Sequence, residues 1–231
     1  MLIGHYGASL LVRKFEPKLR VSAIFVAAQW LDIVWCVLVL VGLEHLRIVP
    51  GITATNGLDL YFMPYSHSMA AAVIWGAMAL VVCRRGFGME WKTAAMLAAI
   101  VSGHWLLDLV VHRRDLLVVS GVAKAGWGLW NHALIAFLLE AALLAWGIGL
   151  MLRQSEAMSM VGVYGMSVLG IIMAGIQALV FFGPVHMTAR QTVSWALFGY
   201  IAFGAIALLL ETQRSERRRG RIKPLPLLKI R

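Results

Sequence analysis

The sequence is short of charge and of cysteine, and each shortage excludes a class of protein. Charged residues make up 14% of the 231 positions and hydrophobic residues 61%, whereas soluble globular chains are about 45–50% apolar. The two cysteines, Cys36 and Cys83, form no CxxC motif and no disulfide framework. The apolar N-terminal segment is followed by Arg13 and Lys14 instead of a small-residue cleavage site, so we do not expect a cleaved signal peptide. With a mean hydropathy of +0.80, the composition predicts an integral membrane protein.

Continuous apolar runs predict helical spans, because the strands of a membrane barrel would alternate apolar and polar residues. A span needs about 20 residues, and six such runs occur at 21–43, 66–82, 93–112, 129–152, 159–182 and 192–210. Ser66 is expected to cap the second span, which places His67 in its first turn. Residues 1–15 are too few to cross and are expected to form a re-entrant or interfacial helix, or a core helix between the spans. We therefore expect an all-α polytopic membrane helical bundle of about six transmembrane helices, with one embedded domain at 1–212 and a basic tail at 213–231.

The formal net charge of +10 is distributed as in a membrane protein rather than a nucleic-acid-binding protein. Basic residues gather at span ends, in 13–20 and 84–92, and in the tail, which includes Arg217–Arg221. The positive-inside rule places these three segments, and so the C-terminal tail, on the cytoplasmic side. The connectors 44–65 and 113–128 then face outward. We expect membrane lipid as a partner and no nucleic acid, and the oligomeric state stays open.

One stretch inside the third run carries most of the chemistry, the segment 102–112 with the sequence SGHWLLDLVVH. Its His104, Asp108 and His112 are spaced by four, so one helix face carries an imidazole, a carboxylate and a second imidazole. A charged side chain at the bilayer centre costs at least about 2.5 kcal/mol, so ionisable residues there mark functional sites.

The other ionisable residues inside apolar runs also lie early in the chain, and the last two runs hold no charged residue. We therefore expect residues 1–152 to form a polar site and residues 153–212 to add two apolar helices. Imidazoles combined with carboxylates form a ligand set that suits zinc and also manganese or iron. The predicted ligands of one ion, or of two ions sharing an aspartate, are His5, Asp32, His67, His104 and Asp108.

Several polar residues also have a structural interpretation. A histidine at the edge of a run is usually interfacial, and this applies to His45, His132 and His186. For His112, an interfacial position and a position beside the ligands are equally expected. Asp32 and Glu140 could hydrogen-bond neighbouring helices, Glu140 could also carry protons, and Asp59 could serve a turn.

Four segments together resemble a known signature: Gly4-His5, Ala28-Gln-Trp-Leu-Asp32, Pro64-Tyr-Ser-His67-Ser and Gly103-His-Trp-Leu-Leu-Asp108. Their order is similar to that of bacterial inner-membrane proteins described as membrane-bound, metal-dependent hydrolase-like, over roughly residues 4–140. The segments 111–116 and 128–131 also resemble a subgroup of these proteins. Many members have Pro-Asp-x-Asp where this chain has Trp30-Leu-Asp32-Ile, so one acidic ligand is missing here.

The resemblance implies a multi-pass protein of the bacterial inner membrane with zinc-type ligands at the five predicted positions. It also implies a distant likeness to zinc-dependent phospholipase C, a helical enzyme that acts on phosphodiesters. The residues expected around the ligands are His112, Tyr65 and Asn131.

The expected function is hydrolysis of a lipid-like or phosphorylated substrate near the outer face of the membrane, assisted by a divalent metal of the zinc type. Candidate bases are Glu140 and Asp115, and Arg113 or Arg114 could bind phosphate through a guanidinium fork. A proton- or ion-coupled transporter is the alternative, because intramembrane Asp, Glu and His also form proton relays. Against it, the sequence has no internal repeat of the kind typical of transporters. A third interpretation is a membrane scaffold whose buried polar groups only join helices.

Overall fold

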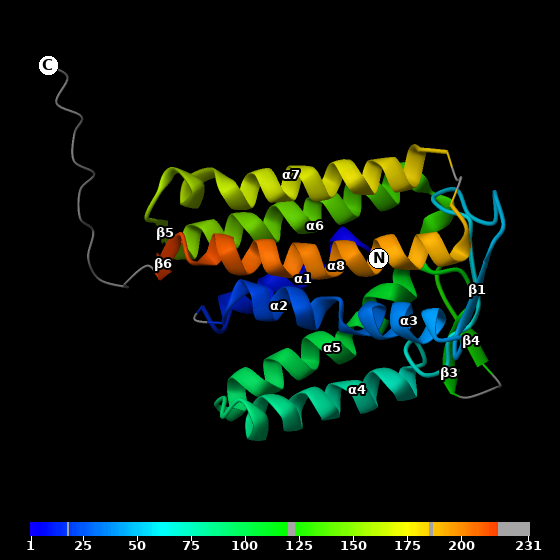
Figure 1. The fold of residues 1–231 in the computed structure, drawn as a ribbon, viewed down its shortest axis with the longest axis horizontal. Coiled ribbons are helices and arrows are strands. Elements are labelled where there is room, and N and C mark those ends of the chain that lie inside the picture. The colour runs from blue at the N-terminus through cyan, green and yellow to red at the C-terminus, as the bar shows by residue number, and fades with distance from the viewer. Residues whose placement is uncertain (18, 120–122, 185–186, 217–231) are drawn as a thin grey trace, which may run out of the picture.

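The computed structural model describes residues 1–17, 19–119, 123–184 and 187–216, which form the predicted all-α polytopic bundle (Figure 1). The α-helices of this part of the chain are α1 (Ile3–Leu10), α2 (Val21–Ala28), α3 (Trp30–Leu40), α4 (Met69–Val81), α5 (Trp91–Val111), α6 (Ala133–Gln154), α7 (Met160–Phe182) and α8 (Ala189–Glu211). Within it, five helices are long and apolar enough to cross a membrane, and α2 with α3 makes a sixth span if that bent pair is counted as one. The chain is therefore a multi-pass membrane protein.

Short elements connect the helices. The helical turns are η1 (Leu11–Lys14), η2 (Val82–Gly86) and η3 (Leu129–Asn131), and the strands are β1 (His45–Ile48), β2 (Leu58–Phe62), β3 (Leu116–Val119), β4 (Ala123–Ala125), β5 (Ser155–Ala157) and β6 (Arg214–Glu216). The strands pair antiparallel as β1–β2, β3–β4 and β5–β6. The first two pairs lie at one end of the bundle and the third at the opposite end (Figure 1). The sequence predicted connectors over 44–65 and 113–128, but it did not predict these strands.

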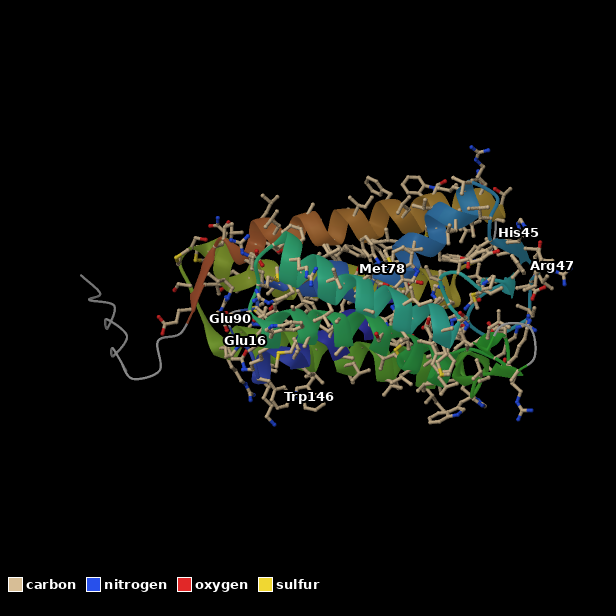
Figure 2. The ribbon with its side chains drawn as sticks, turned by 90° about the horizontal axis from the view of Figure 1, so that it is seen from below. Glu16, His45, Arg47, Met78, Glu90 and Trp146 are labelled. Atoms are coloured by element: carbon tan, nitrogen blue, oxygen red, sulfur yellow. The ribbon has the colours of Figure 1, made fainter. Side chains whose placement is uncertain are left out.

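The basic segments and the predicted outward-facing connector after the first span lie at opposite ends of the bundle. Figure 2 shows Glu16 and Glu90 at one end and His45 and Arg47 at the other. The described parts of the basic segments 13–20 and 84–92 thus share an end with β5–β6. This agrees with the prediction that the basic segments lie on one side of the membrane. Lys18, His186 and the tail residues 217–231 lie outside the described residues.

The short N-terminal helix α1 lies inside the bundle. Ile3 and Tyr6 are 0% exposed, and α1 packs mainly against α6. The two helices approach closely: a Cβ added to Gly7 would lie 2.3 Å from the backbone of Leu143, and one added to Gly147 would lie 2.5 Å from the Gly7 carbonyl oxygen. Three positions were expected for this segment: re-entrant, interfacial, or in the core between the spans. The structure shows the third, a core helix packed among the spans.

The first predicted span is interrupted. α2 and α3 meet at Gln29 with a bend of 49°, so the continuous helix predicted over 21–43 is incorrect. Tertiary hydrogen bonds stabilise the break. The buried Gln29 amide donates to the Leu2 carbonyl oxygen at 2.8 Å, and the Ala28 carbonyl oxygen accepts from His104 at 2.7 Å. Breaks of this kind occur at membrane depth where the backbone groups find partners inside the protein.

The second span begins later than predicted. Ser68, not Ser66, caps α4, because its Oγ accepts the Ala71 N–H at 3.0 Å. His67 therefore precedes the helix instead of lying in its first turn. Ser66 donates its hydroxyl to the buried Glu44 carboxylate at 2.6 Å, which ties this segment to the connector after α3.

Candidate metal centre

The structure brings the five predicted ligands together from four separate segments of the chain. His67 Nε2 lies 3.2 Å from Asp32 Oδ1 and 3.6 Å from Asp108 Oδ2. His104 Nε2 lies 3.8 Å from Asp32 Oδ1 and 3.2 Å from Asp108 Oδ2. His5 Nε2 lies 3.0 Å from the other Asp108 oxygen, Oδ1. His67 and His104 thus each face both aspartates, whereas His5 contacts only Asp108.

The backbone fixes the orientation of His104. Its Nδ1 contacts the Ala28 carbonyl oxygen at 2.7 Å, and a carbonyl can only accept, so Nδ1 carries the proton. A neutral imidazole then presents an Nε2 lone pair toward Asp32 and Asp108. This Nε2 atom is buried and has no hydrogen-bond partner among the described residues, although it is 3.2 Å from Asp108. A lone pair facing carboxylates is unfavourable, so this arrangement requires either a proton on Nε2 or a cation between these groups.

A serine fixes His67 in the same way. The Ser66 hydroxyl gives its proton to Glu44, so it accepts the proton of His67 Nδ1 at 2.8 Å. A neutral His67 then also directs an Nε2 lone pair at the two aspartates. Metal-binding histidines usually have their second ring nitrogen held by such a partner. The sequence did not identify Glu44, because this residue lies more than 20 positions before His67 and no local pattern signals the contact.

The two oxygens of Asp108 serve different neighbours. Oδ1 receives the Met1 amino group at 2.5 Å and His5 Nε2 at 3.0 Å. Oδ2 faces the Nε2 atoms of His67 and His104, and also that of His112 at 3.6 Å. Oδ1 is therefore satisfied within the protein, whereas Oδ2 is available to an ion.

His112 is linked to the surface by a chain of charged side chains. Its Nδ1 contacts Asp115 Oδ1 at 3.0 Å, and Asp115 Oδ2 pairs with Arg113 Nε at 3.2 Å. Arg113 also pairs with Asp59, and Asp59 pairs with Arg47 Nε at 2.5 Å. Asp59, for which only a turn role was expected, thus joins β2 to the segment after α5. Arg113 thus pairs with the carboxylates of Asp59 and Asp115, and Asp115 also contacts His112 on the side away from Asp108.

Glu140 holds the N-terminal helix in place. Its Oε2 accepts the backbone N–H groups of Leu2 and Gly4 at 3.0 and 3.1 Å. The helix α1 has no side-chain cap of its own, so this carboxylate from α6 satisfies its first donors. Glu140 therefore positions His5, which stacks on His104 with ring centroids 3.7 Å apart.

The remaining predicted residues lie away from the centre. The Tyr65 side chain is 57% exposed and packs edge-on against Phe62, and Asn131 is exposed. The neighbour of Asn131 is the residue that reaches the site: Trp130 packs against His112 with ring centroids 4.2 Å apart. Of the histidines expected at the interface, His45 and His132 are both exposed.

A cavity of about 680 Å³ adjoins the centre. Asp32, His67, Asp108 and His112 line its polar end. Its other walls are mostly apolar and come from α7, α8 and the β1–β2 connection. The last two helices, for which the sequence predicted no site residue, thus form a large part of the cavity wall beside the predicted ligands.

Some of the distances between ligand atoms are close to those found around a small divalent ion. Ligand atoms bound to a tetrahedral zinc at about 2.0–2.1 Å lie roughly 3.3 Å from one another. The four histidine–aspartate separations among Asp32, His67, His104 and Asp108 are 3.2, 3.6, 3.8 and 3.2 Å. Two groups could hold an ion, Asp32 with His67 and His104, and His5 with His104 and Asp108. An ion held here would reach the polar end of the cavity.

Comparisons of the chain with protein-family models, with curated proteins and with solved structures find no match.

Proposed function

We propose that this chain is a membrane-embedded, metal-dependent hydrolase whose metal is held by Asp32, His67 and His104, with Asp108, 3.2 Å from His104, as a further ligand. The observation that carries the proposal is the orientation of His104, whose Nδ1–H is held by Ala28 while its unpartnered Nε2 points at two carboxylates. A divalent ion at this point would activate a water molecule and polarise a carbonyl or phosphoryl oxygen. Nitrogen and oxygen ligands of this kind suit zinc first, and manganese or iron as well.

In this proposal, His112 transfers the proton and Asp115 orients it. His112 lines the cavity, and its Nδ1–H donates to the Asp115 carboxylate at 3.0 Å, which leaves Nε2 to accept a proton from a reactant. A carboxylate behind a histidine stabilises the imidazolium that forms. Arg113 holds Asp115 from the far side, at 3.2 Å. Glu140 contributes by fixing α1 and His5, not as the base.

The substrate is lipid-like or carries a phosphate ester, and it reacts toward the β1–β2 end of the bundle. Support comes from the mostly apolar cavity that begins at Asp32 and Asp108. The opposite end carries the described parts of the basic segments 13–20 and 84–92, and the positive-inside rule supports a cytoplasmic position for that end. The C-terminal tail then begins on the cytoplasmic side, and the resemblance to the hydrolase-like family points to a bacterial inner membrane.

Metal analysis of the detergent-purified protein tests the centre. We expect a stoichiometric divalent metal in the wild type and its loss in His104→Ala and Asp108→Asn. His132→Ala and Glu90→Gln change exposed residues of the same types and should keep the metal. A wild-type protein that contains no metal after loading with zinc, manganese or iron would refute the centre.

Turnover tests the assignment of roles. The probe is a short-chain phosphatidylcholine in mixed micelles, with products identified by mass spectrometry. We expect His112→Ala to keep the metal and lose product formation. Equal turnover in His112→Ala and the wild type would exclude His112 as the proton-transfer group.

A second function, ion- or proton-coupled transport, is favoured by one observation. The break between α2 and α3 places Asp32 in the first turn of a half-helix, as discontinuous helices do at transporter binding sites. Flux into liposomes that depends on Asp32 and Asp108 in metal-free protein would support transport over hydrolysis.

A further inference from the structure

The cavity beside the candidate centre contains polar groups that the proposed chemistry does not use. Gln177 of α7 is 0% exposed, and neither atom of its amide has a hydrogen-bond partner among the described residues. Trp35 and Trp130 line the same cavity, and their indole N–H groups are likewise buried and unpartnered in the described structure. Burying an unpaired polar group costs free energy. These three groups therefore point to a ligand that brings its own acceptors.

The cavity also has an apolar part that reaches the surface of the membrane spans. Leu179 of α7 and Trp195 and Phe198 of α8 line it, yet they are 74%, 63% and 63% exposed. Residues that are both exposed and part of the wall mark its mouth. Because α7 and α8 are long and apolar enough to be spans, this mouth opens toward lipid acyl chains rather than toward water.

We propose that the cavity binds a bilayer phospholipid that enters sideways between α7 and α8. One acyl chain lies along the apolar walls, and the amide and indole donors of Gln177, Trp35 and Trp130 bind its ester or phosphate oxygens. The volume of about 680 Å³ lies within the range of roughly 300–1,000 Å³ that small-molecule sites occupy. The proposal rests on the proposed function only for the direction of the lipid, whose polar end lies at Asp32 and Asp108.

Gly199 provides a steric test of this site. It lines the cavity on α8, and a Cβ added there would meet nothing within 4 Å, so a large side chain can enter the space without displacing the backbone. Gly175 on α7 is the matched control. A Cβ there also meets nothing within 4 Å, but Gly175 is not part of the cavity wall.

The experiment uses the full chain in vesicles of phosphatidylethanolamine and phosphatidylglycerol that contain a phosphatidylcholine with a diazirine in one acyl chain. After illumination, labelled peptides are identified by mass spectrometry. Met63 lines the cavity and is 1% exposed, so lipid around the outside of the bundle cannot reach it. We expect label at Met63 in the wild type and in Gly175→Trp, its loss in Gly199→Trp, and a partial loss in Gln177→Leu.

A Gly199→Leu variant with an unchanged unfolding temperature replaces Gly199→Trp if the latter does not fold. Absence of label at Met63 in the wild type, or label that is unchanged by filling the cavity at Gly199, would overturn the proposal. Metal content is measured on the same samples. Label without metal supports the lipid site and rejects the hydrolase centre. Metal without label supports the hydrolase centre and rejects the lipid site.

Discussion

Replacing Ser66 by alanine tests the metal centre without touching a proposed ligand. The Ser66 hydroxyl accepts the His67 Nδ1–H at 2.8 Å and donates to Glu44 at 2.6 Å. Without it, His67 can move its proton to Nε2, where the proposed metal requires a lone pair. Partners that orient metal-bound histidines contribute about 10–100-fold in metal affinity. We therefore expect Ser66→Ala to weaken zinc binding by this factor, or about 1.4–2.8 kcal/mol at roughly 1.4 kcal/mol per tenfold.

Ser68→Ala is the matched control. Ser68 caps α4 by accepting the Ala71 N–H and donates to the Pro64 carbonyl oxygen, but it contacts no proposed ligand. Loss of such a cap costs about 0.5–2 kcal/mol of stability. Both variants should therefore unfold at a lower temperature, while only Ser66→Ala loses zinc affinity.

Zinc affinity is measured by titrating the metal-free protein in detergent against a chromophoric chelator at fixed pH, and stability by thermal unfolding of the same samples. Zinc dissociation constants that agree between Ser66→Ala and the wild type would refute the reasoning about the proton on His67. An equal loss of affinity in Ser66→Ala and Ser68→Ala would show that the effect follows from folding and not from the orientation of His67.

Four further variants, one of them a control, test the packing and the roles assigned to other residues. Gly7→Ala should prevent α1 from docking on α6, because its Cβ would lie 2.3 Å from backbone atoms of α6. Gly149→Ala is the control: its Cβ meets nothing within 4 Å, so this variant should gain about 0.5–1 kcal/mol of stability. Thermal unfolding distinguishes the two variants. Gln177→Leu should raise the unfolding temperature in lipid-free detergent, because an unpaired buried amide costs about 1–3 kcal/mol; a lower temperature would mean that the amide is already satisfied. Asp115→Asn should keep the metal and lose turnover, and metal loss in this variant would instead make His112 a ligand.

The sequence predicted the helices and the convergence of the polar residues because both follow from periodicity and burial. The spacing of four places His104 and Asp108 on one face of α5, and both side chains are 1% exposed in the bundle. The cost of exposing such groups to lipid turns them toward the interior. Asp32 of α3 and His67, which precedes α4, join them for the same reason.

The break at Gln29 could not be predicted because no local signal marks it. Residues 21–41 contain neither glycine nor proline, so the apolar run looks continuous. The break is stabilised by bonds to Leu2 and His104, which are far away in the sequence. The hairpin β1–β2 could not be predicted from local signals either. Pro50, Gly51 and Gly57 indicate turns, but nothing in the sequence indicates that the two strands pair and line a cavity.

The placement of Asp108 explains why the centre needs a further positive charge. Asp32 and Asp108 bring two carboxylates into a buried site, and within the described residues the only cation other than histidine in contact with either is the Met1 amino group. An unpaired buried carboxylate costs several kcal/mol. Either an imidazole accepts a proton or a metal supplies the charge. His104 Nε2 lies 3.2 Å from Asp108 Oδ2, which is close enough for a hydrogen bond if His104 accepts a proton. If His104 stays neutral, the same lone pair is free to bind a metal ion. The metal content of the wild-type protein therefore distinguishes the two sources of positive charge.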